Sequence, residues 1–280
     1  MSASGADWLR AARARADAVP LAPRVPLALA AAAPTAPAHR IGSIEPALAE
    51  RMLAARLPIA AHAAGWCIAA PAAKSLAAIA RWLHATRLAA HWRNELLAVV
   101  DDEGRTVGAI ERGVVRVLGI ATEAVHLVGV DARGATWVQK RAMSKSTDPG
   151  LWDTTMGGQV AAGERVGTTL MRETMEEAGI EVAALSDLVH APPILIRRPV
   201  PEGYMVERIE IFRGVVPDGI EPVNRDGEVE RFERLDDAAL VARLAAGEFT
   251  LEATLILGAE LERRGIVAVD VAVEGAEGSA

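Results

Sequence analysis

Three glutamates stand at helical spacing near the end of the segment "VGTTLMRETMEEAGI". Positions i, i+3 and i+4 share one helix face, so Glu173, Glu176 and Glu177 are expected to project into one region about a turn long. Repulsion between such neighbours costs roughly 0.2–0.5 kcal/mol per pair on a solvated face. Gly179 is the expected C′ residue, which puts the carboxylates where the helix dipole favours cations. Because both local effects oppose this placement, a compensating partner is expected.

Two interpretations of these carboxylates are open. In the first, they form a solvated acidic face relieved by Arg172, which is spaced i, i+4 from Glu176. In the second, they hold a hard divalent cation such as Mg²⁺, which carboxylates bind beside substrate phosphates. The preceding loop "GGQVAAGE" favours the second, because Gly157 and Gly158 let the backbone approach a ligand closely and Glu164 adds a further carboxylate.

The whole stretch resembles the signature of the Nudix hydrolases. The fixed positions are all present, as Gly158, Glu164, Arg172, Glu173, Glu176, Glu177 and Gly179, with an aliphatic residue, Ile180, at the end. Seven such positions coincide by chance with a probability on the order of 10⁻⁸ per start site. The one departure is Thr174, where the family usually has an aliphatic residue; its methyl group still allows packing.

This resemblance implies an α/β fold, a Nudix α/β/α sandwich with a mixed sheet. It also implies hydrolysis of a diphosphate linked to another moiety, with Mg²⁺ or Mn²⁺ as cofactor. By family analogy, Glu173, Glu176 and Glu177 supply metal ligands and the carboxylate that activates water, while Arg172 pairs with Glu164 to hold the loop against the helix. The spacing does not say which glutamate is the general base.

The chain of 280 residues is long enough for two domains. Residues 1–38 are predicted to form an N-terminal helix followed by an Ala/Pro-rich linker, and residues 39–115 a small α+β domain. The Nudix domain is expected over residues 116–268, and residues 269–280 read as a frayed tail. Within these units, hairpins are predicted around Gly104 and between Asp131 and Gly134.

Composition narrows the class of partner. The formal net charge of −7 argues against a general nucleic-acid or membrane-surface binder. Cys67 is the only cysteine, which excludes an internal disulfide and a cysteine-rich zinc site. Neither a signal-peptide core nor a membrane-spanning apolar run is found, and a cytoplasmic location is expected. The resemblance implies a small-molecule diphosphate as the partner. The oligomeric state is open, a homodimer included.

Further candidates for the site flank the signature. Lys140, Arg141 and Lys145 precede the glycine loop and are candidates to meet phosphate oxygens, with solvated surface as the alternative. Trp152 is a candidate to stack on an aromatic ring of the substrate, or else to pack in the core. In "NRDGEVERF", Glu228 is the candidate for a further metal ligand, and an ordinary exposed strand acid is the alternative.

The flanking segments also resemble particular Nudix subgroups. "STDPGLWDTTMGGQV" is similar to the stretch before the signature in the subgroup related to isopentenyl-diphosphate isomerase. Isomerisation there requires a cysteine within the Nudix domain, and Cys67 lies well before it. Nearly the whole chain resembles Nudix proteins related to the region fused to thiamine pyrophosphokinase in some fungi.

That second resemblance implies hydrolysis of thiamine diphosphate, or of its damaged oxy and oxo forms, to the monophosphate. Two alternatives stay open. One is a Nudix hydrolase of another nucleoside-diphosphate derivative or small organic diphosphate. The other is a non-catalytic Nudix binding module, against which the intact glutamate set argues.

Overall fold

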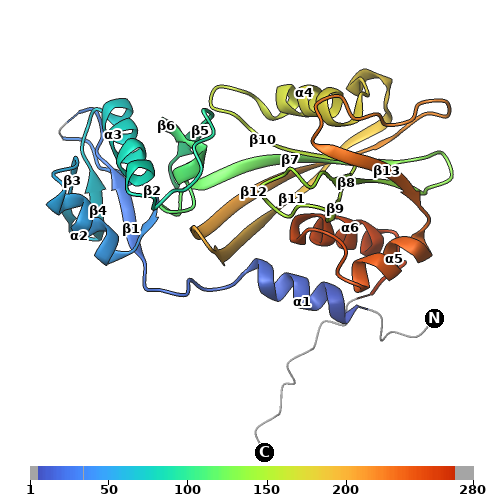
Figure 1. Ribbon diagram of the computed structural model, residues 1–280, viewed down its shortest axis with the longest axis horizontal. Helices are drawn as coiled ribbons and strands as arrows, with labels where there is room; N and C mark the ends of the chain where they lie inside the picture. The colour runs from blue at the N-terminus through green and yellow to red at the C-terminus, as the bar shows by residue number, and fades with distance from the viewer. Residues whose placement is uncertain (1–5, 34, 269–280) are drawn as a thin grey trace, which may run out of the picture.

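Two units, each built on its own sheet, lie end to end along the long axis of the molecule (Figure 1). The computed structural model describes residues 6–33 and 35–268. The predicted tail at 269–280 falls outside these residues. Among the helices of the described ranges, none has the length and apolarity needed to cross a membrane.

The smaller unit is a four-stranded sheet in the order β2-β1-β4-β3, followed by a two-stranded hairpin. A single core of buried aliphatic side chains runs from β1 through the hairpin to residue 120. Its elements are β1 (Val25–Leu29), β2 (His39–Ile44), α2 (Pro46–Ala54), β3 (Ile59–His62), β4 (Gly65–Ile68), α3 (Ala72–Ala85), β5 (Leu96–Val100), β6 (Thr106–Glu111) and the 3₁₀ helix η1 (Arg112–Val114). The hairpin predicted around Gly104 is confirmed as β5–β6.

Strand β1 corrects the predicted linker. It pairs antiparallel with β2 and parallel with β4, so it is an inner strand of the small sheet. Leu27 and Leu29 alternate along it and are fully buried, and this spacing outweighs the Ala/Pro-rich composition around it. Pro26 is tolerated because pairing with β4 begins only at Leu27.

The larger unit is a seven-stranded mixed sheet in the order β11-β12-β7-β8-β13, with β10 paired to β7 and β9 to β8. Strands β12 and β7 are parallel, and the other pairs are antiparallel. The hairpin predicted between Asp131 and Gly134 is confirmed as β7–β8. The strands are β7 (Ala121–Val130), β8 (Thr136–Arg141), β9 (Trp152–Asp153), β10 (Met156–Gln159), β11 (Ser186–Val200), β12 (Gly203–Val215) and β13 (Val229–Leu235).

Helices cover both faces of this sheet (Figure 1). One face carries α4 (Val166–Ala178) and the 3₁₀ helix η2 (Val182–Ala184); the other carries α5 (Asp237–Ala245), α6 (Leu251–Arg263) and α1 (Asp7–Ala16). Alternate residues of β7 point to opposite faces of the sheet and pack into the hydrophobic core on each face. Val125 and Leu127 pack on the α4 side, and Ala124 and Val128 on the α6 side. The predicted α/β/α sandwich with a mixed sheet is confirmed.

The N-terminal helix belongs to the larger unit, although β1 belongs to the smaller one. Helix α1 packs against α6, where Leu9 is 0% exposed and fills the space over Gly258. A Cβ added to Gly258 would lie 2.5 Å from Leu9 Cδ1. Arg13 also pairs with Glu262 of α6. The predicted segment 1–38 is therefore divided between the two units.

Replacing Leu9 with alanine is expected to lower the free energy of unfolding by about 2–4 kcal/mol, because a fully buried leucine contact with α6 is lost. Urea denaturation followed by tryptophan fluorescence measures the change. Leu21→Ala is the matched control, since Leu21 is 91% exposed. Equal effects of the two substitutions would show that α1 does not contribute to the core as described.

Candidate active site

Helix α4 ends where the sequence predicts. Gly179 takes the left-handed conformation, with φ of +64°, and closes the helix, so Glu173, Glu176 and Glu177 lie in its last two turns. Thr174, between them, is fully buried. Its hydroxyl has no hydrogen-bond partner among the described residues, so the side chain packs as an aliphatic one would.

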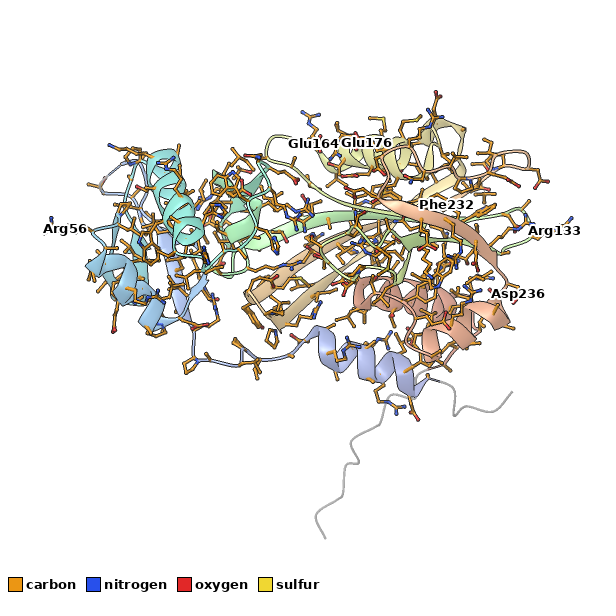
Figure 2. All side chains as sticks on the ribbon, in the orientation of Figure 1. Arg56, Arg133, Glu164, Glu176, Phe232 and Asp236 are labelled. Carbon is orange, nitrogen blue, oxygen red and sulfur yellow. The ribbon has the colours of Figure 1, made fainter. Side chains whose placement is uncertain are left out.

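Arg172 joins the loop before α4 to the helix. Its Nε and Nη2 donate to the two carboxylate oxygens of Glu164, at 3.0 and 2.9 Å. Its Nη1 donates to Glu173 at 2.8 Å and to Glu176 at 3.1 Å. The hydrogen bonds from Arg172 lower the pKa of Glu164 to about 2. One guanidinium thus balances part of the carboxylate charge, and Figure 2 shows Glu164 and Glu176 close together on the outer layer formed by α4.

Glu177 points inward from α4 and is 1% exposed. Its carboxylate accepts a hydrogen bond from the backbone N–H of Gly157, at 3.0 Å, and one from the side-chain amide of Gln139, at 2.9 Å. The ammonium of Lys145 lies 3.6 Å away. Burial raises the pKa of Glu177 to about 7. These contacts orient the carboxylate between the helix and strands β8 and β10.

The loop before β13 brings two further carboxylates to Glu177. One oxygen atom from each of Glu177, Asp226 and Glu228 lies within 4.8 Å of the others. Asn224 shapes the loop by accepting a hydrogen bond from the backbone N–H of Asp226 at 3.2 Å. Glu228 was the sequence candidate. Asp226 was not among the sequence candidates, although the acidic run "DGE" contains both residues.

This group fits a divalent cation. Carboxylate oxygens are the donors that Mg²⁺ and Mn²⁺ prefer. The ammonium of Lys145 also contacts Glu228 and lies near Glu177, so a positive charge already occupies the neighbourhood. Of the predicted metal ligands, Glu177 and Glu228 are brought together, whereas Glu173 and Glu176 are engaged by Arg172.

Two adjoining cavities open beside these groups. The carboxylate cavity, about 360 Å³, is lined by all five glutamates singled out from the sequence, Glu164, Glu173, Glu176, Glu177 and Glu228. The inner cavity, about 340 Å³, lies between the two units and is lined by residues of both. Six residues line both cavities and so mark their junction: Arg112, Lys145, Gly157, Gly158, Gln159 and Glu228.

The two glycines of β10 make room for side chains. A Cβ at Gly158 would lie 2.2 Å from the carboxyl carbon of Glu173, and one at Gly157 would lie 2.5 Å from Cε1 of His126. His126 is buried beneath the strand, its Nδ1 is 2.8 Å from the hydroxyl of Thr154, and burial lowers its pKa. The glycines are therefore required by the packing of Glu173 and His126, in addition to any ligand.

Two of the predicted substrate contacts lie elsewhere. Lys140 lies on the opposite face of β8 from Gln139 and Arg141, because side chains alternate along a strand. Its amine is 5.8 Å from the ring of Trp152. Trp152 is 4% exposed and packs in the core beside Phe249. Trp152 therefore follows the core-packing alternative, and Lys140 lies outside the lining of both cavities among the described residues.

Arg141 and Lys145 remain at the cavities in different ways. Arg141 lines the inner cavity, but its guanidinium donates to Asp153 at 3.0 Å and to the carbonyl of Thr147 at 2.9 Å. It therefore organises the loop between β8 and β9. Lys145 lines both cavities and contacts the carboxylates directly.

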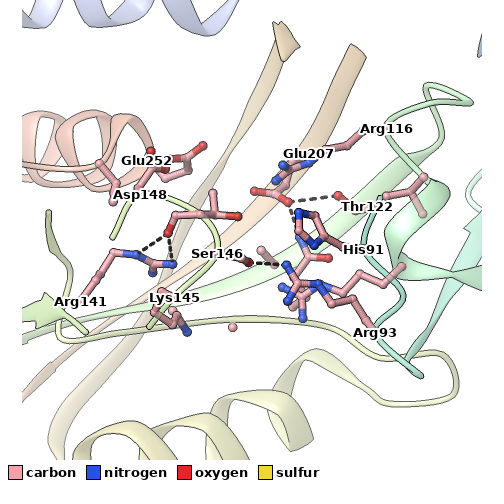
Figure 3. Close-up of a pocket in the computed structure, with 18 of the residues that line it drawn as sticks. His91, Arg93, Arg116, Thr122, Arg141, Lys145, Ser146, Asp148, Glu207 and Glu252 are labelled. Atoms are coloured by element: carbon pink, nitrogen blue, oxygen red, sulfur yellow. Dashed lines mark hydrogen bonds between the residues drawn. The ribbon is translucent and has the colours of Figure 1, made fainter. Parts of the chain in front are cut away.

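The smaller unit contributes cations that the sequence did not assign to the site. Arg112 of η1 lines both cavities and pairs with Glu95 at 2.7 Å. His91 and Arg93 line the inner cavity opposite Arg141 (Figure 3). Nothing in the local sequence indicates that these side chains face the second unit, because only the packing of the two units decides it.

Two acidic residues lie in the inner cavity on the side of α6. Glu207 of β12 is buried and accepts hydrogen bonds from the hydroxyl of Thr122, at 3.1 Å, and from the side-chain amide of Gln159. Glu252 stands in the first turn of α6. Burial raises the pKa of Glu252 to about 7, the charge of Glu207 adds to the rise, and Arg198, 3.7 Å away, opposes it.

Comparison with known proteins identifies the larger unit. Residues 121–254 match the NUDIX domain family model. This stretch runs from the first strand of the mixed sheet into α6 and contains the glycine strand, α4 and the loop of Asp226 and Glu228. Residues 121–254 therefore have the sequence pattern and the fold of a Nudix domain.

Several known proteins are similar to parts of this chain. An uncharacterized Nudix hydrolase of Pseudomonas aeruginosa, PA4841, is 37% identical over 93 residues, 33% of this chain and 55% of the relative. Isopentenyl-diphosphate Delta-isomerase of Corynebacterium glutamicum is 28% identical over 167 residues, 58% of this chain and 87% of the relative. The crystal structure of DR0079 from Deinococcus radiodurans is 27% identical, covers 61% of this chain and 98% of its own, and has a TM-score of 0.47.

The match to the first curated relatives is partial. The chain spans about half their length, 55% for PA4841 and 43% for Nudix hydrolase 20, chloroplastic, of Arabidopsis thaliana.

Glu252→Gln is expected to stabilise the protein at alkaline pH. The folded-state pKa of about 7 lies above the ordinary 4.5, so the folded protein keeps a proton that the unfolded chain releases. Ionisation therefore opposes folding increasingly from pH 4.5 to pH 7 and fully above it. At pH 8 the glutamine variant should be more stable by up to about 3 kcal/mol, and below pH 4.5 the difference should vanish.

Urea denaturation at pH 4 and pH 8 measures this difference. Glu248→Gln is the control, because Glu248 is exposed in the turn before α6. A Glu252→Gln variant that is less stable than the parent protein at pH 8 would show that the charged form is favoured by the fold.

Proposed function

We propose that the protein is a Mg²⁺-dependent Nudix diphosphatase that hydrolyses thiamine diphosphate, or its oxy and oxo analogues, to the monophosphate. The observation that carries the enzymatic part is the convergence of Glu177, Asp226 and Glu228 at the glycine strand of a Nudix domain. The thiamine part is supported by the resemblance of the flanking segments and by a cavity for an organic group beside the carboxylates.

The reaction needs a water molecule to add to one phosphorus while the bridging P–O bond breaks, which yields an organic monophosphate and orthophosphate. Glu177, Asp226 and Glu228 are the residues that would hold Mg²⁺. When bound, the cation supplies neutralisation of phosphate oxygens and acidification of a water. Arg112 and Lys145, at the junction of the two cavities, are placed to bind the negatively charged diphosphate.

We assign the proton-accepting role to Glu173. Its carboxylate lies against Gly158 in the carboxylate cavity, outside the convergent group of three. Burial raises its pKa above the ordinary range, although Arg172 opposes the rise. A carboxylate whose pKa is nearer to neutral accepts a proton from water more readily than a fully solvated one.

Three observations bear on the alternatives. Hydrolysis of another nucleoside-diphosphate derivative would use the same carboxylates. Thiamine-type and nucleoside-type substrates would therefore be distinguished only by how their organic groups fit the inner cavity. Isomerisation requires a thiol at the site, and Cys67 lies in β4 of the smaller unit, outside the lining of both cavities among the described residues. A non-catalytic role would leave the complete set of glutamates around the carboxylate cavity without a purpose.

A panel of diphosphates tests the proposal. Phosphate release with Mg²⁺ is measured from thiamine diphosphate, oxythiamine diphosphate, ADP-ribose and isopentenyl diphosphate. The expected result is the highest kcat/KM for a thiamine-type substrate, loss of turnover with EDTA and recovery with added Mg²⁺. If the folded protein turns over none of the diphosphates, the proposed enzymatic function is contradicted. If it prefers ADP-ribose, the thiamine-type substrate is contradicted and ADP-ribose takes its place.

Gly158→Ala is expected to lower kcat at least tenfold on the best substrate of the panel, because the new Cβ would displace the carboxylate of Glu173. Gly167→Ala is the matched control. Gly167 lies in α4, the helix that carries Glu173, and a Cβ there meets no atom within 4 Å among the described residues. Its activity should be unchanged. Full activity of Gly158→Ala, with circular dichroism showing the folded state, would remove Glu173 from the proposed chemistry.

A further inference from the structure

Charged side chains of both signs line the inner cavity. Lys145 and Arg93 lie on the side that faces α4, where the carboxylate cavity begins, and Glu207 and Glu252 lie on the far side (Figure 3). Arg112 adds a third cation at the junction. Arg116 and Arg198 also line the cavity, and Arg198 lies 3.7 Å from Glu252, so the acidic end, defined by Glu207 and Glu252, also contains positive charge.

The acidic end is incompletely neutralised. Glu207 is bonded only by neutral donors, the hydroxyl of Thr122 and the amide of Gln159. The side chain of Glu252 is 14% exposed, and among the described residues it accepts no hydrogen bond from another side chain. The guanidinium of Arg198 is 3.7 Å from Glu252, and its own buried Nε lacks a partner among the described residues. The carboxylate oxygens of Glu207 and Glu252 can accept further hydrogen bonds and therefore favour a ligand that supplies donors, whereas the Nε–H of Arg198 is a donor and calls for an acceptor.

We propose that the inner cavity binds the organic part of the diphosphate substrate, and that Glu207 and Glu252 select a nitrogen-containing ring with positive charge or N–H donors. The proposal rests on the proposed function, whose substrate it defines by chemical class. A ring of this kind would satisfy the two carboxyl groups, while the diphosphate would meet Arg112 and Lys145. The ligand would thus be oriented by charge along the cavity.

The dimensions and walls of the cavity agree with this assignment. About 340 Å³ lies within the usual range of small-molecule sites. The shared residues Gly157, Gly158 and Gln159 connect it to the carboxylate cavity, so one molecule can reach both. His91 and Arg93 of the smaller unit form the opposite wall. The smaller unit therefore limits the size of the group that the Nudix domain can accept.

A structural role for Glu252 makes a different prediction. An acidic residue in the first turn of α6 interacts favourably with the helix dipole. The helix is already capped by Thr250, whose hydroxyl accepts the backbone N–H of Ala253 at 3.1 Å. Loss of a dipole interaction would change stability and would leave the preference among ligands unaltered. Ligand preference is therefore the measurement that separates the two roles.

Equilibrium binding tests the proposal without requiring turnover. Calorimetry with Mg²⁺ measures the Kd of thiamine monophosphate, whose thiazolium ring is cationic, and of isopentenyl monophosphate, whose organic part is uncharged. The parent protein should prefer thiamine monophosphate, and Glu252→Gln should weaken that ligand by about 10- to 100-fold, as expected for a hydrogen bond to a charged group. Isopentenyl monophosphate should change by less than about threefold.

Glu248→Gln is the control and should keep the preference of the parent protein, because Glu248 lies outside both cavities. Equal Kd values for the two monophosphates in the parent protein, or an unchanged preference in Glu252→Gln, would overturn the proposal. If the selective binding is present but the diphosphate panel shows no turnover, the ring subsite stands and the proposed diphosphatase function falls.

Discussion

The buried carboxylate of Glu177 is the contact on which the arrangement of the site depends. It lies on α4, accepts hydrogen bonds from Gly157 of β10 and Gln139 of β8, and faces Glu228 across the ammonium of Lys145. A helix, two strands and a loop distant in the sequence therefore meet around the carboxylate of Glu177. Desolvation of this carboxylate opposes folding, and its hydrogen bonds and the nearby ammonium offset part of that cost.

The ion pairs of Arg172 hold the loop before α4 against the helix. Arg172 and Glu164 join the loop to α4 through two parallel hydrogen bonds, which is the geometry that gives the strongest ion pairs. Glu173 and Glu176 share that guanidinium, so their repulsion is reduced without removing them from the cavity. The crowding of like charges at the end of the helix is thus compensated in part by Arg172, and the ammonium of Lys145 lies beside Glu177 and Glu228.

The smaller unit forms part of the wall of the inner cavity beside the Nudix domain. Its η1 helix and the segment around His91 close one side of the inner cavity, and Arg112 reaches the junction with the carboxylates. The hairpin β5–β6 also contacts the loop after β10, where the N–H of Ala162 donates to the carbonyl of Leu96. Residues of both units therefore line one cavity, and the burial of Glu252 there opposes its ionisation.

The sequence by itself determined the Nudix signature, the helix that carries it, the end of that helix at Gly179 and the sandwich class of the fold. These follow from local spacing and from backbone preferences, which neighbouring residues along the chain decide. Glu228 was also found, because its acidic run lies in a short loop before a strand.

Tertiary structure alone decided the rest. The sequence left two alternatives open for Lys140 and Trp152, because the face of a strand that meets a ligand depends on which layer covers it. Val25–Leu29 was misread because its partners β2 and β4 follow later in the chain. Asp226, Arg112 and Glu252 stand far apart in the sequence, and only the packing of the two units and the path of the loops bring their charges to one pair of cavities. Long-range packing of this kind leaves no local periodicity in the sequence. The spacing of residues therefore predicted the carboxylates of α4, whereas the cavity beside them could not be predicted.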